Sequence, residues 1–300
     1  MDITRLADLR PRFVWDIVDD AFDLYRERFA LFLGVTAVAY VPALLLDGWI
    51  SSVTTRSVGT SDVVSATFLS TIFLSWPIQV IASTFQIAAV AVVVDGQIRG
   101  TPIPNTGAAY GPVIQRSGAL LCVAALIAVL SSLGVITAFI LSLYIAIYSA
   151  FTALILVLER RPIGNAFKRS FALAGGDRAR VFGVLVLIGF LTLILMGGVT
   201  AVVGLAFSMT PHGAADAASR EQQTSLMMKS VNGVITILLK PIGAIALTLL
   251  YFDLRVRREG IDLAAQAKER NVELAADPFG DLPSTRVVRD QQRGRKVRTK

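Results

Sequence analysis

The sequence predicts an all-α, polytopic integral membrane protein with six transmembrane helices, cytoplasmic interfacial helices and both termini in the cytoplasm. Hydrophobic residues make up 54% of the 300 residues and charged residues only 17%, and the mean hydropathy is +0.63. No charged residue occurs in the tracts 63–94, 117–158 and 181–215. A soluble protein with such tracts would expose large apolar patches. The third observation is the uneven distribution of Lys and Arg between the two sides that these tracts define.

The apolar tracts are long enough for six crossings. A helix needs about 20 residues to cross about 30 Å of hydrocarbon. The tract 117–158 would be about 63 Å long as one helix at about 1.5 Å per residue, so it predicts two crossings joined by a turn near residues 131–134. The predicted spans are about 29–49, 66–94, 117–132, 135–158, 181–208 and 231–252.

The segments outside residues 29–252 are predicted to lie at the membrane surface or beyond it. Residues 1–28 contain an N-terminal amphipathic interfacial helix, because apolar residues recur at helical spacing from Val14 to Tyr25 while Asp residues face elsewhere. Similar segments precede the third and fifth spans, which suggests three units of interfacial helix, span and return span. An internal triplication and a generic pattern of membrane entry both explain this layout. Residues 253–270 are predicted to be a cytoplasmic helix extension and residues 271–300 a disordered basic tail.

The basic residues predict the orientation. With six spans both termini share one side, and 25 of the 29 Lys and Arg residues lie on that side. The positive-inside rule places it in the cytoplasm of a bacterial-type inner membrane. The net charge of +7 reflects this bias and does not indicate nucleic-acid binding. We expect anionic lipid headgroups as partners of the basic residues; for the tail, solubility alone is the alternative.

Lys240 is the most unusual residue, because it lies in the middle of the sixth predicted span. A charge there costs about 2.5–3.5 kcal/mol on insertion and tends to face a bundle interior or a wet cavity. One hypothesis is a polar cavity between the first, second and sixth spans, lined by Lys240, Gln79 and Gln86, which attracts an anionic headgroup or solute. The alternative is that Lys240 snorkels towards the outer face or hydrogen-bonds Gln79 or Asp47 as structural glue.

Each even-numbered span ends in an acidic residue that is followed by arginine. If these charges are buried among helix ends, they are expected to pair into a ring at the cytoplasmic edge that fixes the interfacial helices. Otherwise they are solvated boundary charges worth less than about 1 kcal/mol each. The candidate members of the ring are Asp95, Glu159, Arg169, Asp253 and Arg255.

No cofactor or metal site is expected. The one histidine, His212, has no second His or Cys beside it that would complete a zinc site. The sequence contains no glycine pattern of a phosphate-binding loop and no nucleophile elbow.

Three sequence elements resemble a known family. They are "AFDLYRERFALFL" before the first span, "LVLERRPIGNAFKRSFALAGG" after the fourth and "LLYFDLRVRREGIDL" after the sixth. Together they are similar to the membrane domain attached to some bacterial glycerophosphoryl diester phosphodiesterases and to its stand-alone relatives, over roughly residues 13–264. The resemblance implies a six-span helical bundle. It implies no activity for this chain, because the phosphodiesterase chemistry belongs to a separate soluble barrel.

The sequence therefore predicts a non-enzymatic membrane scaffold or lipid-interacting module, with an unknown membrane-protein partner as a further option. The alternative is a small transporter or flippase-like protein that uses the polar cavity around Lys240. A continuous water-accessible cavity would favour the transporter, whereas a dry, close-packed centre would favour the scaffold.

Overall fold

A computed structural model describes residues 14–57, 69–137, 139–209 and 217–259. Every secondary-structure element in these ranges is a helix, so the predicted all-α class is confirmed for the described residues. The chain divides into a main unit, residues 1–254, and a second unit, residues 255–300. The predicted tail, residues 271–300, and the first 13 residues lie outside the described residues.

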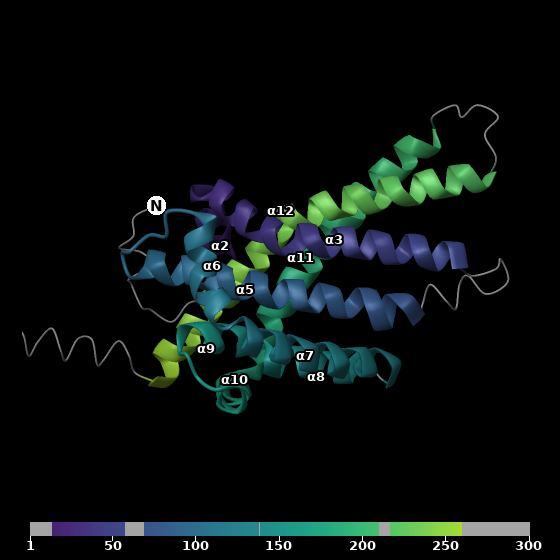
Figure 1. The fold of residues 1–300 in the computed structure, drawn as a ribbon. Coiled ribbons are helices and arrows are strands. Elements are labelled where there is room, and N and C mark those ends of the chain that lie inside the picture. Colours follow the sequence, from purple (N-terminus) through teal and green to yellow (C-terminus); the bar gives the residue numbers. More distant parts are fainter. Residues whose placement is uncertain (1–13, 58–68, 138, 210–216, 260–300) are drawn as a thin grey trace, which may run out of the picture. The chain divides into compact units, whose positions relative to one another are not determined.

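Figure 1 shows the helices of the described residues, labelled along the chain. In chain order they are α2 (Val14–Glu27), α3 (Phe29–Ser57), the π-helix η1 (Thr71–Ser75), α5 (Trp76–Ile98), α6 (Thr106–Gln115), α7 (Ser117–Thr137), α8 (Phe139–Ser149), α9 (Thr152–Leu158), α10 (Ile163–Gly176), α11 (Arg178–Ser208) and α12 (Ala217–Glu259).

Four helices of the described residues are each long and apolar enough to cross a membrane: Phe29–Thr54, Thr71–Ile98, Arg178–Ala206 and Met227–Arg257. The number rises to five if Thr106–Gln115 and Ser117–Leu133, which are bent by 79° relative to each other, form one span. The predicted fourth span falls on α8 and α9, where the apolar helix Leu143–Leu158 is shorter than the other four. The chain is thus a helical protein with membrane-spanning character, and the count of six stays a prediction.

The turn predicted near residues 131–134 is not at those residues, because α7 is helical through them and ends at Thr137. Ser131 and Ser132 are instead buried, and their hydroxyls form hydrogen bonds with η1 and α5. The Trp76 indole nitrogen donates to Ser131 Oγ at 2.9 Å, and Ser132 Oγ donates to the Ile72 carbonyl oxygen at 3.2 Å.

The π-helical turn η1 explains why Ser132 is needed. In a π-helix the Ile72 carbonyl would accept from the residue five positions later, which is Pro77, and proline has no N–H. The Ser132 hydroxyl therefore supplies the hydrogen bond that the backbone of this helix cannot supply, and it ties α7 to the start of α5.

The break between α8 and α9 is made by a side chain from a different helix. Ser170 of α10 is fully buried. Its Oγ donates to the Tyr148 carbonyl oxygen at 2.7 Å and accepts the Phe151 N–H at 3.3 Å. A side chain inserted into the ladder of helical hydrogen bonds is a known cause of such breaks. The predicted span 135–158 is consequently divided at residues 150–151.

Each of the short helices α2, α6 and α10 leads directly into a long helix, so the three predicted units have structural counterparts. We call them the first triplet (α2, α3, η1–α5), the second triplet (α6, α7, α8–α9) and the third triplet (α10, α11, α12). This order of elements agrees with the predicted layout. Whether the triplets share an ancestor stays a prediction.

Each short helix packs against a different triplet from its own. Tyr25 of α2 donates its hydroxyl to the Leu238 carbonyl oxygen of α12 at 2.8 Å. Tyr110 of α6 donates to the Val35 carbonyl oxygen of α3 at 2.8 Å, and α10 reaches α8 and α9 through Ser170. Thus α2 bonds to the third triplet, α6 bonds to the first and α10 bonds to the second. These contacts form a closed cycle that holds the three triplets of the main unit together.

The densest part of the core lies along α5, α9 and the second half of α12. Residues 88–94 of α5 are all buried, as are residues 152–157 of α9 and residues 244–251 of α12. Residues 88–94 are all Ala or Val, and small side chains allow helices in a membrane to approach closely.

Candidate functional site

The Glu159 carboxylate, at the end of α9, joins three elements of the main unit. Its Oε1 accepts a hydrogen bond from the Tyr251 hydroxyl of α12 at 2.7 Å and from Arg169 Nε of α10 at 3.4 Å. Arg161 Nε lies 2.6 Å from Oε2. The side chain is 10% exposed, so the ion pairs are largely shielded from solvent. Glu159 therefore fixes α10 against α9 and α12, and the structure brings the predicted residues Glu159 and Arg169 together.

Two other predicted edge charges, Asp253 and Asp95, pair with other arginines. Asp253 pairs with Arg180 of α11, at 3.2 Å from Nη2 to Oδ2, and both side chains are largely buried. Asp95 pairs with Arg99, the residue directly after α5, whose side chain is 63% exposed. Arg255 belongs to the second unit, so its membership of the ring stays a prediction.

The side chain of Arg116 also holds the turn that leads into α10. Arg160 has a left-handed backbone conformation, with φ of 53°, which non-glycine residues rarely adopt. Its carbonyl oxygen accepts a hydrogen bond from Arg116 Nη2 at 3.1 Å. The turn into α10 is thereby tied to the boundary between α6 and α7.

A polar pocket of about 330 Å³ lies between α3, η1–α5 and α12. It is at the opposite end of these helices from α2, α6 and α10 (Figure 1). From α3 come Asp47, Ser51 and Thr54; the second wall has Thr71, Ser75, Trp76 and Gln79; and α12 contributes Lys229. Lys229 Nζ donates a hydrogen bond to Ser51 Oγ.

Helical spacing explains why these polar residues share one pocket. Asp47, Ser51 and Thr54 stand at i, i+4 and i+7, which places them on one face of α3. Ser75 and Gln79 are likewise four residues apart. This regular spacing of polar residues on apolar helices could have revealed the pocket from the sequence. Lys229 was missed because it was assigned to the outer loop.

The three residues predicted to line a polar cavity do not come together. Only Gln79 lines the pocket. Gln86 is buried two turns deeper in α5, where its Nε2 donates to Thr36 Oγ1 at 3.2 Å. Lys240 is exposed at the surface of the main unit, with Nζ 5.7 Å from the centre of the Tyr40 ring. An ammonium at this distance from an aromatic face is in cation–π contact.

A small apolar cluster lies on the same helices as the walls of the pocket. Tyr40, Ala43 and Ala82 form a buried apolar cluster, and Ile78 and Ile237 pack against it. Tyr40 is fully buried. On α3, Tyr40 and Ala43 lie one to two turns from Asp47, and on α5, Ala82 lies about one turn from Gln79.

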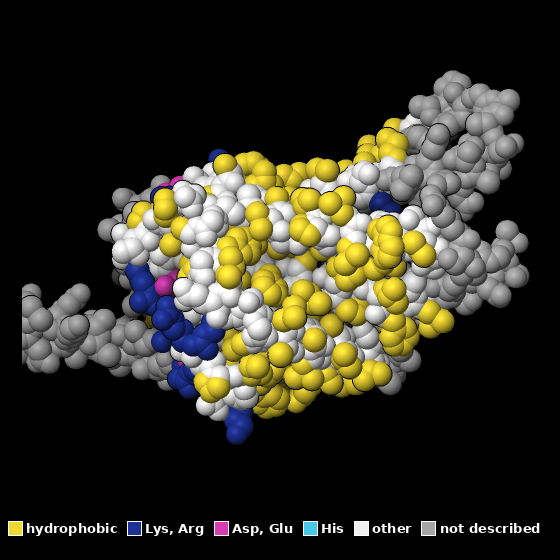
Figure 2. Space-filling view, in the orientation of Figure 1, with side chains coloured by type: hydrophobic (Ala, Val, Ile, Leu, Met, Phe, Trp, Pro, Cys, Tyr) yellow, Lys and Arg dark blue, Asp and Glu magenta, His cyan; other side chains and the backbone are white. Residues whose placement is uncertain are grey.

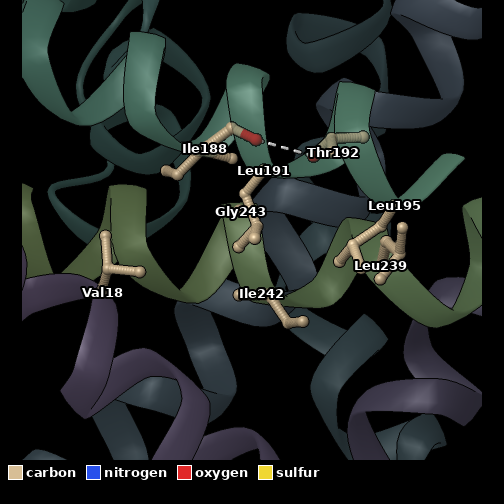
Figure 3. A pocket seen from close by; sticks show the side chains of 8 residues that line it. All are labelled: Val18, Ile188, Leu191, Thr192, Leu195, Leu239, Ile242 and Gly243. Atoms are coloured by element: carbon tan, nitrogen blue, oxygen red, sulfur yellow. Dashed lines mark hydrogen bonds between the residues drawn. The ribbon is translucent and has the colours of Figure 1, made fainter. Parts of the chain in front are cut away.

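A second hollow lies between α2, α11 and α12 and is too small for a ligand (Figure 3). Its volume is about 10 Å³, which is about the room for one water molecule. The lining is apolar apart from Thr192, whose hydroxyl donates to the Ile188 carbonyl oxygen in its own helix at 2.8 Å. Gly243 allows this close approach, because a Cβ there would lie 3.0 Å from Ile188 Cγ2.

Two tyrosines of the short helices have perturbed acidities. Burial raises the pKa of the Tyr110 hydroxyl and, to a smaller extent, that of Tyr25. Both hydroxyls donate to backbone carbonyls and are neutral at physiological pH. In the described part of the chain no three His, Cys, Asp or Glu side chains lie close enough to hold a metal ion.

No family model, curated protein or solved structure matches the chain. The resemblance to the phosphodiesterase membrane domain therefore stays a prediction, and the function has to be argued from the geometry of the chain itself.

Proposed function

We propose that this protein is a non-enzymatic, lipid-interacting membrane scaffold of a bacterial-type inner membrane. Its long helices cross the bilayer six times, and the end with α2, α6 and α10 faces the cytoplasm together with both termini. Anionic headgroups of the cytoplasmic leaflet contact the basic side chains at that end.

The observation that carries the proposal is the juxtaposition of exposed cations and exposed apolar side chains around α10. Four exposed cations lie on α10 or beside it: Arg160, Arg161, Lys168 and Arg178. The aromatic side chain of Phe171, on α10, is exposed as well. Figure 2 shows Lys and Arg side chains gathered where α9 and α10 lie, next to a surface on which hydrophobic side chains predominate. This is the pattern of a helix that lies in the membrane interface.

The polar pocket supports a scaffold over a small transporter with a cavity around Lys240. Of the three residues expected around that cavity, only Gln79 lines the pocket. Gln86 is buried against Thr36, and Lys240 is exposed and is not part of the pocket's lining.

An anionic-lipid titration tests the proposal. The purified protein is reconstituted in zwitterionic nanodiscs that contain increasing fractions of a fluorescent phosphatidylglycerol, and energy transfer from tryptophan is measured. Each basic residue near an anionic surface contributes about 1 kcal/mol. We therefore expect the triple variant R160Q/R161Q/K168Q to weaken the enrichment of this lipid by about tenfold or more, with a loss of salt dependence.

Arg26 offers a matched control. It is also exposed at this end, but its neighbours on α2 include Asp23 and Glu27, so the local surface is not positive. The Arg26→Gln variant should retain the enrichment. An equal effect of both variants, or enrichment that is independent of salt and of all four residues, would contradict the proposal.

A further inference from the structure

We propose that the polar pocket between α3, η1–α5 and α12 binds a zwitterion that carries both an ammonium and a phosphate, as in the headgroup of an ethanolamine phospholipid. This site is independent of the proposed scaffold function. It lies at the other end of the helices from α10 and takes a different lipid chemistry.

The first argument is the pair of opposite charges in one pocket. Asp47 and Lys229 both line it. Among the described residues the Asp47 carboxylate takes part in no hydrogen bond or ion pair, and Lys229 bonds to Ser51 and to no carboxylate. Both side chains are half-buried, where leaving a charge without a partner is costly. A ligand with an ammonium for Asp47 and an anionic group for Lys229 would satisfy both.

The same two charges select against ligands of a single sign. A purely anionic group drawn to Lys229 is repelled by Asp47, and a simple amine drawn to Asp47 is repelled by Lys229. Repulsion of this kind is a normal source of specificity. The pocket is therefore matched to a molecule with no net charge and two separated charged groups.

The remaining polar groups suit phosphate oxygens. Ser75 presents a hydroxyl on the η1–α5 wall, and Gln79 adds an amide about one turn further along α5. Hydroxyl and amide N–H groups donate to phosphate, and a lysine ammonium binds it as a point charge. The carboxylate of Asp47 belongs to the α3 wall and is the acceptor for the ammonium.

Size and surroundings indicate a lipid as the source of the zwitterion. The volume of about 330 Å³ is at the lower limit of ligand pockets, which run from about 300 Å³ upwards, so a headgroup fits and acyl chains do not. Exposed apolar side chains beside the pocket would receive the chains, among them Leu69, Phe73 and Leu74. Trp49 and Trp76 are also exposed there, and tryptophan favours the headgroup level of a bilayer.

The experiment measures binding by the purified full-length protein in detergent, using isothermal titration calorimetry. The probes are dihexanoyl phosphatidylethanolamine, dihexanoyl phosphatidylglycerol and soluble glycerophosphoethanolamine, which is the zwitterionic headgroup without its acyl chains. We expect the ethanolamine lipid to bind more tightly than the glycerol lipid. Because hydrogen bonds to charged groups are lost, Asp47→Asn and Lys229→Gln should each weaken ethanolamine-lipid binding by about tenfold or more.

Two matched variants control for general effects of charge. Asp95→Asn and Lys240→Gln remove the same charges elsewhere in the main unit and should leave binding unchanged. Far-UV circular dichroism and thermal unfolding verify that each variant is folded. Asp47→Lys provides a second readout, because it leaves two cations in the pocket and should shift the preference to the glycerol lipid.

The outcomes separate the sources of the zwitterion. Tight binding of the ethanolamine lipid with weak binding of glycerophosphoethanolamine supports a headgroup site on a lipid, and equal binding of the two supports the same site with a soluble ligand. Binding of neither overturns the proposal. So does equal binding of both lipids that is insensitive to Asp47 and Lys229, or a preference that Asp47→Lys does not move.

Discussion

Replacing Glu159 by alanine should destabilise the main unit much more than replacing another acidic residue at the same end. The Glu159 carboxylate bonds Tyr251, Arg169 and Arg161 and so links α9, α10 and α12. Asp95 is the matched control, because it is an acidic residue at the end of a long helix and pairs with Arg99, only four residues along the chain.

The expected loss follows from how far each partner is buried. The Tyr251 hydroxyl belongs to a fully buried residue and lies 2.7 Å from the carboxylate; a hydrogen bond to a charged group contributes about 1.5–3 kcal/mol. Arg169 and Arg161 are 23% and 47% exposed, so each ion pair contributes about 1 kcal/mol or less. We expect Glu159→Ala to lower the free energy of unfolding by about 3 kcal/mol.

The conservative variant and the control should give graded results. Glu159→Gln keeps an acceptor for Tyr251 but loses the charge, so it should lower the free energy of unfolding by about half as much as Glu159→Ala. Asp95→Ala removes an exposed pair at i, i+4 and should cost about 0.3–0.5 kcal/mol. A double-mutant cycle of Glu159→Ala with Tyr251→Phe measures the coupling energy between the two side chains, which we expect to be about 1 kcal/mol or more.

The assay is unfolding by sodium dodecyl sulfate in mixed micelles, followed by far-UV circular dichroism. If Glu159→Ala and Asp95→Ala cost the same, within about 0.5 kcal/mol, the carboxylate does not hold the three helices together and the inference of a structural hub is wrong.

The remaining predictions use the same unfolding assay. Ser170→Ala should lower the free energy of unfolding by about 1–3 kcal/mol, because it removes both hydrogen bonds at the break between α8 and α9. The Ser149 hydroxyl bonds within its own helix, so Ser149→Ala should be nearly neutral. Equal losses for the two variants would contradict the role of Ser170. Gly243→Leu should cost about 1–3 kcal/mol by overpacking, and Gly189→Leu, where a Cβ meets nothing within 4 Å, should not. Burial raises the pKa of Tyr110, so above about pH 10 the unfolded state releases a proton that the folded state keeps, and the free energy of unfolding should fall as pH rises. Tyr110→Phe should make this fall shallower. A pH profile that is unchanged in the variant would contradict the role assigned to Tyr110.

Hydropathy and helical periodicity predicted most of the helices. The long apolar helices coincide with the predicted spans near residues 29–49, 66–94, 181–208 and 231–252, and α2 and α10 coincide with predicted amphipathic segments. These features follow from the burial of apolar residues along one element and need no knowledge of neighbours.

The features that the sequence did not predict depend on distant residues. Ser131 and Ser132 have the composition of a turn, but their hydroxyls bond η1 and α5, so the helix continues through them. The break in the fourth predicted span is made by Ser170, about twenty residues further along the chain. The cyclic packing of α2, α6 and α10 likewise arises only when the triplets meet.

The candidate site was predicted in part. A polar region between the first, second and sixth spans was expected, and the pocket lies between α3, α5 and α12 with Gln79 in its wall. The expected cation was Lys240, because a charge in the middle of a span is conspicuous in a hydropathy profile. The structure instead has Lys229 in the pocket, and it leaves Lys240 exposed with its ammonium near the ring of the buried Tyr40. The side of the bundle on which a residue of α12 lies depends on how that helix packs against its neighbours.

The most direct measurement is the accessibility of single cysteines on either side of α11 in intact cells. In a Cys122→Ser background, Lys168→Cys lies on α10 and Met209→Cys just after α11, and both positions are exposed. We expect a membrane-impermeant maleimide to label position 209 in intact cells and position 168 only after permeabilisation. Labelling of position 168 in intact cells, or labelling of both positions under the same condition, would contradict a membrane-crossing main unit whose basic end faces the cytoplasm.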